Sequence, residues 1–197
     1  WSGEPYDSLQ DSLAAEEGLA KVREALSRED YRAADTLALR LQGPNSNRYM
    51  PMGNVRIDLH NDAAASDYLR TLDIRRGVAR VEYNAGGVKY ARETFVSHPD
   101  GVVVMKFSAD GGKALNMDLS FDTPLRFRTN ADGRCLLASG YAPYDKDYSY
   151  DPERGTRFAV RMRICRTDGE VSYTDTSALL RNASEAVLVI SGATSFN

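Results

Sequence analysis

The sequence predicts a mainly β protein, a large antiparallel β-sandwich (a supersandwich) with a short helical hairpin at its N-terminus. Apolar residues recur with helical spacing from Leu13 to Leu41, and after Asn45 they alternate with polar residues at a period of two. Turn-forming residues separate the alternating stretches at short intervals. About ten strands without intervening helices favour two packed sheets, because strongly twisted open sheets of that size rarely remain single.

Two short helices are predicted in the helical stretch, because its apolar residues form two stripes. The stripes consist of Leu19, Val22 and Leu26, then Tyr31, Ala34, Leu37 and Leu41. Ser12 is predicted to cap the first helix and Asp30 the second, since both side chains can accept a hydrogen bond from the first turn. Gly43 and Pro44 end the second helix. We therefore expect a helical hairpin that packs on another part of the protein.

Strict alternation identifies strands with one buried face. The buried sets are Val55, Ile57 and Leu59; Leu115, Met117, Leu119 and Phe121; and Phe158, Val160, Met162 and Ile164. Hairpin turns are predicted at residues 84–87, 110–112, 132–133 and 168–169, where Asn, Asp and Gly tolerate positive φ. Short turns of this kind join antiparallel neighbours, so the sheets are expected to be mainly antiparallel.

Length and composition fit one structural domain. We expect residues 1–44 to carry the helical hairpin, packed on a sandwich formed by residues 45–197. Hydrophobic residues make up 42% and charged residues 27% of the 197, and the net charge is −3 with acids and bases interspersed. The sequence contains no basic stripe that would bind nucleic acid and no apolar run of about 20 residues that would span a membrane.

Residues 1–11 lack the features of a signal peptide, which leaves the compartment open, and a periplasmic or extracellular parent protein stays an alternative.

The two cysteines, Cys135 and Cys165, are too few for a disulfide scaffold. Cys165 is expected beside Arg161 and Arg163 on the exposed face of a strand. Two free thiols are the favoured interpretation, and a single bridge between them stays the alternative.

No catalytic residue, metal site or cofactor is predicted. Nucleophile elbows, phosphate-binding loops, dinucleotide fingerprints and zinc motifs are all absent. Asp58, His60 and Asp62 would share an outward face if their strand ran that far, but a solvated strand end is the favoured interpretation. Asp118 and Asp122 alternate with buried residues, so we expect them to point into solvent, where nothing would tune their pKa for acid or base catalysis.

The segment from Gly140 to Thr156 combines four tyrosines with four acidic residues. Its acids follow the first positions of a calcium loop, but Tyr150 stands where the loop requires Gly and Thr156 where it requires Glu, so calcium binding is not predicted. The tyrosines Tyr141, Tyr144, Tyr148 and Tyr150 can stack on sugar rings or pack against a neighbouring domain. Packing is the favoured interpretation.

An ordered set of residues resembles the N-terminal domain of glycoside hydrolase family 95, the bacterial α-L-fucosidases. The set consists of Tyr49, Pro51, Gly53, Tyr68, Arg70, Leu72, Asp73, Tyr90, Arg92, Glu93, Phe95, Ser97 and Pro99, with Trp1-Ser2-Gly3, Pro5-Tyr6-Asp7, Arg23, Ala34, residues 155–158 and residues 193–196. The resemblance covers nearly the whole chain.

The resemblance implies a β-sandwich that packs on an (α/α)6 barrel, with the catalytic acid and base in that barrel, beyond Asn197. The parent enzyme would hydrolyse terminal α-L-fucosides with inversion, and this chain would be an accessory domain. Trp1, Tyr49 and the four tyrosines of the 140–156 segment are the candidates for a substrate-entrance or inter-domain surface. An independent carbohydrate-binding module, with glycan as its ligand, and a purely structural domain are the alternatives.

Relatives are expected to carry early strands of the sandwich before the Trp-Ser-Gly motif. An open sheet edge would therefore be a surface for self-association, because unpaired N–H and C=O groups bind another strand.

Overall fold

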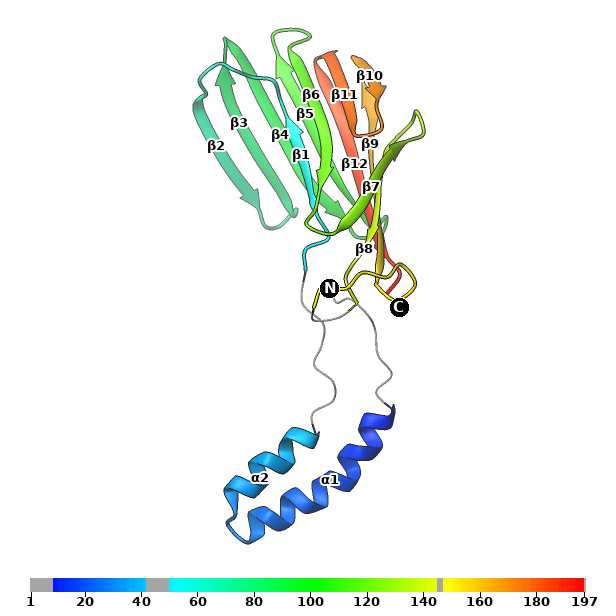
Figure 1. Ribbon diagram of the computed structural model, residues 1–197. Coiled ribbons are helices and arrows are strands. Elements are labelled where there is room, and N and C mark those ends of the chain that lie inside the picture. The colour runs from blue at the N-terminus through cyan, green and yellow to red at the C-terminus, as the bar shows by residue number, and fades with distance from the viewer. Residues whose placement is uncertain (1–8, 42–49, 145–146, 197) are drawn as a thin grey trace. The chain divides into compact units, whose positions relative to one another are not determined.

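A computed structural model describes residues 9–41, 50–144 and 147–196 of the chain (Figure 1). The chain divides into two units: residues 1–50 with 143–156, and residues 51–142 with 157–197. Among the described residues, the first unit contains the helices and the second contains the strands.

The helical unit contains α1 (Leu9–Ser27), α2 (Tyr31–Ala38) and a 3-10 turn (Leu39–Leu41). Asp30 caps α2, because its Oδ1 accepts a hydrogen bond from the Ala33 N–H at 3.0 Å, as predicted. The predicted cap at Ser12 is wrong, since α1 begins at Leu9 and residue 12 lies inside the helix. The predicted stop at Gly43 and Pro44 lies outside the described residues. Neither helix is both long and apolar enough to span a bilayer, within the part of the chain that the structure describes.

The larger sheet has eight strands in the order β2-β3-β4-β5-β12-β9-β8-β7, and every neighbouring pair is antiparallel. Its strands are β2 (Ser66–Asp73), β3 (Val78–Ala85), β4 (Val88–Ser97), β5 (Val102–Asp110), β7 (Arg126–Ala131), β8 (Leu136–Tyr141), β9 (Arg157–Thr167) and β12 (Glu185–Thr194).

The smaller sheet has four antiparallel strands in the order β1-β6-β11-β10. They are β1 (Asn54–Asp58), β6 (Leu115–Asp122), β10 (Glu170–Tyr173) and β11 (Ser177–Ala183). The prediction of a mainly β sandwich with an N-terminal helical hairpin is thereby confirmed.

The sandwich core lies between the inner faces of the two sheets. Along β6 buried and half-buried residues alternate strictly, and Met117 and Leu119 are completely buried. Along β9 the buried residues are Phe158, Val160, Met162 and Ile164, as the alternation predicted. Such alternation places one face of each strand in the core and the other toward solvent.

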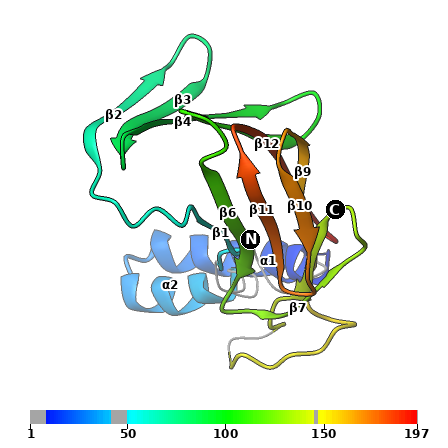
Figure 2. The same ribbon diagram turned by 90° about the horizontal axis from the view of Figure 1, so that it is seen from above.

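The two sheets differ in width by a factor of two. Seen from above, β2 and β3 extend beyond β1, the edge strand of the smaller sheet (Figure 2). The inner face of the larger sheet is therefore covered by the smaller sheet over only part of its width.

Tight turns join the neighbouring strands. The β3–β4 hairpin turns at Gly86 and Gly87, whose φ angles of 58° and 78° suit a two-residue hairpin turn. Cys135 and Cys165 are both free, the first buried and the second exposed, which agrees with the favoured interpretation.

Candidate functional site

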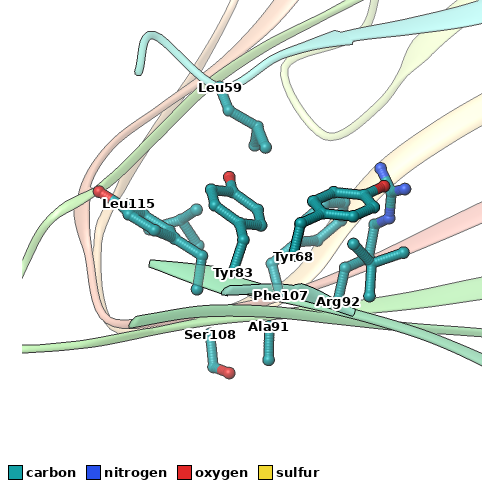
Figure 3. A pocket seen from close by; sticks show the side chains of 10 residues that line it. Leu59, Tyr68, Tyr83, Ala91, Arg92, Phe107, Ser108 and Leu115 are labelled. Carbon is teal, nitrogen blue, oxygen red and sulfur yellow. The ribbon is translucent and has the colours of Figure 1, made fainter. Parts of the chain in front are cut away.

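Three tyrosines form a stacked row on the inner face of the larger sheet, on strands β2, β3 and β4. Figure 3 shows two of them, Tyr68 and Tyr83, side by side. The rings of Tyr83 and Tyr90 have centroids 5.2 Å apart and planes inclined by 16°. Tyr68 continues the row, with its centroid 6.3 Å from that of Tyr83. We call these three residues the tyrosine row.

Strand register places the row. Tyr83 and Tyr90 are direct partners across the β3–β4 hairpin, so their side chains emerge on the same face. A β-bulge between Ser66 and Leu69 sets Tyr68 beside them, because it adds a residue to β2 at that point.

The row lines a cavity of about 180 Å³. Its lining residues are Leu59, Tyr68, Val81, Tyr83, Tyr90, Ala91, Arg92, Phe107, Ser108 and Leu115. Leu59, from the segment after β1, lies across the cavity from the rings of Tyr68 and Tyr83 (Figure 3). Burial raises the pKa of the Tyr83 phenol, so its hydroxyl stays protonated at neutral pH.

A wider and more open depression of about 610 Å³ adjoins this cavity and shares Leu59 and Tyr83 with it. Arg56, Asp58 and Asn61 contribute polar groups to its lining. The two hollows together follow the border between the covered and the uncovered part of the larger sheet.

Aromatic faces, phenol hydroxyls and the Arg92 guanidinium are the chemistry of the cavity at the tyrosine row. Such groups hold an apolar or aromatic side chain, or the flat face of a sugar ring, while the hydroxyls donate hydrogen bonds. The cavity lining includes no carboxylate, histidine or cysteine. The arrangement is suited to binding a flat or apolar group.

A second cluster lies on the outer face of the smaller sheet. The Oδ1 of Asp118 lies 2.6 Å from Nη1 of Arg181 and 3.0 Å from Nε2 of His60. Burial raises the pKa of Asp118, but the hydrogen bonds from Arg181 and His60 outweigh it, so the pKa lies below its ordinary value.

Asp118 and Asp122 lie on the outer face of β6, as predicted, but they are not free there. Both are half-buried, and Asp122 pairs with Arg56 through an Oδ2–Nη2 distance of 2.6 Å. Strand register explains the Asp122 pair, because Arg56 of β1 lies opposite Ser120, two residues from Asp122 on the same face of β6. The lowered pKa of Asp118 makes that carboxyl group a poor general acid near neutral pH.

The possible ligand set of Asp58, His60 and Asp62 does not form. β1 ends at Asp58, and the Asp58 carboxylate accepts a hydrogen bond from the His60 N–H, which turns the chain. The imidazole then points to Asp118. Among the described residues no group of three or more His, Cys, Asp or Glu side chains could hold a metal ion.

The tyrosines predicted from the 140–156 segment do not share one element. Tyr141 is the last residue of β8, whereas Tyr144, Tyr148 and Tyr150 belong to the irregular part of the segment. The guanidinium of Arg154 lies 3.9 Å from the centre of the Tyr144 ring, a cation–π contact that occupies one face of that ring. Trp1 and Tyr49 lie outside the described residues.

Sequence reasoning did not identify the tyrosine row as a site. One signal was present: Tyr83 and Tyr90 stand at equal distances from the Gly86-Gly87 turn, which makes them cross-strand partners in a two-residue hairpin. Tyr68 carried no such signal, because the bulge that brings it into the row is not encoded by simple alternation.

Comparison with known proteins gives the family. The model of the family "Glycosyl hydrolase family 65, N-terminal domain" matches residues 1–197, the whole chain. The chain belongs to this family. The resemblance to an N-terminal domain of a glycoside hydrolase is confirmed, with the family number 65 in place of 95.

The chain is also similar in sequence to a fucosidase. Alpha-L-fucosidase 2 of Arabidopsis thaliana is 28% identical over 216 residues, which cover 100% of this chain and 25% of that protein. The chain thus spans about a quarter of the length of the curated relative that it matches, and a larger multidomain parent is implied. A protein described as a kojibiose phosphorylase from human microbiome is similar with a TM-score of 0.45 and 11% identity, over 74% of this chain and 23% of that one.

Proposed function

We propose that this chain is the N-terminal accessory domain of a glycoside hydrolase that removes terminal α-L-fucose from glycans with inversion of configuration. The observation that carries the proposal is the alignment of the whole chain with a quarter of Alpha-L-fucosidase 2. In this proposal the catalytic acid and base belong to an (α/α)6 barrel elsewhere in the parent, and the sandwich supports that barrel beside the substrate entrance.

The chemistry of the described residues supports an accessory role. An inverting hydrolase needs a general acid whose carboxyl group stays protonated and a general base about 6.5 to 9.5 Å from it across a pocket. The half-buried carboxylates of the smaller sheet are instead engaged by Arg181, His60 and Arg56. The cavity at the tyrosine row is lined by no carboxylate.

The test is the activity of the parent protein on a fucosylated oligosaccharide such as 2′-fucosyllactose. We expect release of fucose without added phosphate, with β-L-fucose as the first product in the ¹H NMR spectrum. Cleavage that depends on inorganic phosphate would identify a phosphorylase and contradict the proposal, as would release of α-L-fucose first.

The carbohydrate-binding module stays the second candidate, and the tyrosine row is the observation that favours it, because stacked phenol rings suit sugar faces. Calorimetric titration of the protein with fucosylated glycans tests this function. Binding that is lost in Tyr83→Ala would support a module, whereas no heat of binding for any fucosylated glycan would contradict it.

A further inference from the structure

Positive charge is concentrated at one end of the larger sheet, in β7, β8 and β9, whereas β2 forms the other end (Figure 1). These three strands contain no aspartate, glutamate or lysine, although the net charge of the chain is −3. Their arginines are Arg126, Arg128, Arg157, Arg161, Arg163 and Arg166. This end of the sheet is therefore cationic in a protein that is acidic as a whole.

Strand register places four of these arginines together on the outer face of the sheet. Along β9, exposed arginines alternate with the buried side chains of the core. Arg128 of β7 lies opposite Ser139 of β8, and Ser139 lies opposite Ala159, an exposed residue of β9. Side chains at paired positions emerge on the same face. We call the four exposed residues the arginine face: Arg128, Arg157, Arg161 and Arg163.

The guanidiniums of the arginine face are not neutralised by the described residues. None of the four lies within ion-pair distance of a described carboxylate, whereas Arg166 lies 3.4 Å from Glu185 and is not counted in the face. Asp132, in the β7–β8 turn, acts on Arg161 only at longer range, and its carboxylate already accepts hydrogen bonds from two backbone N–H groups at 2.9 Å. Arg161 and Arg163 stand about 7 Å apart along the strand, so their like charges repel and an anion would relieve the repulsion.

The other half of the same outer face is arranged differently. Arg80 of β3 forms ion pairs with Glu82 and Glu93, and Lys89 of β4 pairs with Glu82 at 3.2 Å. Carboxylates of the chain itself balance the cations there. The absence of acids is thus a local feature of β7, β8 and β9 and not a general property of the sheet.

We infer that the arginine face binds the carboxylates of an acidic glycan, a polysaccharide chain that contains uronic acid residues. A planar guanidinium donates two parallel hydrogen bonds to a carboxylate, and every cationic residue of the three strands is an arginine. Small uncharged side chains, those of Ser139 and Ala159, separate the cations across the strands. An extended anionic chain reaches several guanidiniums at once, so that contacts which are weak singly add together.

The composition of the face favours a glycan over other acidic partners. The core of a permanent protein interface is apolar and aromatic, whereas small side chains and unneutralised guanidiniums occupy this face. Single-stranded nucleic acid is bound on exposed aromatic side chains, but Tyr141, the outward aromatic residue of these strands, is half-buried. The choice of a glycan rests on the proposed function, in which the parent protein acts on glycans.

Calorimetric titration of the full parent protein with oligogalacturonate tests the inference. We expect binding that weakens as the salt concentration rises from about 0.1 M to about 1 M, because salt screens exposed charges. A neutral gluco-oligosaccharide of the same length should not bind. Arg161→Gln with Arg163→Gln should weaken the binding of oligogalacturonate about five- to twentyfold, since one exposed ion pair contributes about two- to fivefold.

Two further double variants sharpen the test. Arg75→Gln with Arg76→Gln removes the same charge at exposed positions of the β2–β3 turn and should leave the affinity unchanged. The hydrogen bonds of this turn to Asp73 come from backbone N–H groups, so they remain. Arg161→Lys with Arg163→Lys keeps the charge but removes the planar fork, so it should weaken binding as well. Urea unfolding of each variant confirms that it is folded.

Several results would overturn the inference. They are no heat of binding for oligogalacturonate, an unchanged affinity in the Arg161→Gln and Arg163→Gln double variant, or an equal loss in the double variant of the β2–β3 turn. Tighter binding of dextran sulfate or of single-stranded DNA would assign the face to another polyanion, and full affinity in the lysine variant would contradict the recognition of carboxylates. Fucose release from neutral 2′-fucosyllactose is measured separately, so its absence beside oligogalacturonate binding would contradict the proposed function alone.

Discussion

The carboxylate of Asp168 ties the β9–β10 turn to the junction of β11 and β12. It accepts hydrogen bonds from the N–H of Ser184 at 2.8 Å, the Ser184 hydroxyl at 2.7 Å and the N–H of Glu185 at 3.2 Å. These donors, the Ser184 hydroxyl first, lower the pKa of Asp168 from 3.8 to about 2. A depressed folded-state pKa stabilises the protein above the ordinary pKa, and this stabilisation is lost as the pH falls toward the folded value.

We therefore expect Asp168→Ala to lower the urea midpoint at pH 7. The difference from the unmodified protein should shrink as the pH falls from about 4 to about 2, because protonation then removes the same interaction. Urea unfolding at pH 7 and pH 3 measures both effects. Asp175→Ala, at an exposed position in the β10–β11 turn, is the control, and it should change the urea midpoint little. If Asp168→Ala lowered the urea midpoint equally at both pH values, the stabilising role of the ionised Asp168 carboxylate would be contradicted.

Gly140 of β8 is required by a close approach of the neighbouring strand and an aromatic ring. A Cβ at this position would lie 2.2 Å from the carbonyl oxygen of Arg126 and 2.7 Å from Cε1 of Phe158. Gly140→Ala should lower the free energy of unfolding by about 1–3 kcal/mol, because a backbone oxygen moves less readily than a flexible side chain. Thermal unfolding checks this prediction, with Ser139→Ala as the control at the neighbouring position. Equal melting temperatures for Gly140→Ala and Ser139→Ala would contradict it, because they would show that the strands move apart to accept the methyl group.

β6 contributes four buried side chains to the core, those of Leu115, Met117, Leu119 and Phe121. Leu119 is completely buried between the sheets, while Ser120 faces the other side of the strand. Leu119→Ala should cost about 2–5 kcal/mol of unfolding free energy, since it removes buried methyl groups and leaves a cavity. Ser120→Ala should lower the free energy of unfolding much less. Urea unfolding of the two variants measures the difference, and equal losses of free energy would contradict the burial of Leu119.

Alternation was sufficient to predict elements that have one fully buried face. The sequence of β6 and β9 predicts both strands and their buried sides, because the period-two pattern is complete there. β2 could not be assigned in this way, since all eight of its residues are exposed. The width of the two sheets was equally unpredictable, because strand order depends on pairing between segments far apart in the sequence, such as β5 with β12.

The candidate site was predictable only in its chemistry. The tyrosines of the 140–156 segment were predicted either to stack on sugar rings or to pack against a neighbouring domain, with packing favoured, because they lie close together in the sequence. The row formed by Tyr68, Tyr83 and Tyr90 depends on register and on a bulge. A row of this kind is found from the positions of the tyrosines relative to a hairpin turn and not from their local density in the sequence.

At the scale of the whole molecule, the accessory role predicts that the ionised cluster of the smaller sheet contributes to stability and not to turnover. Asp118→Asn in the parent protein removes a charge that Arg181 and His60 surround, so unfolding should require less urea than in the unmodified parent. Its kcat and KM on a fucosylated substrate should stay within about twofold, whereas loss of a general acid or base typically costs about 10²- to 10⁴-fold. Steady-state kinetics beside urea unfolding separates the two effects, with Asp175→Asn as the surface control. A hundredfold fall in kcat for a parent that remains folded would place chemistry in this sandwich and would overturn the accessory role.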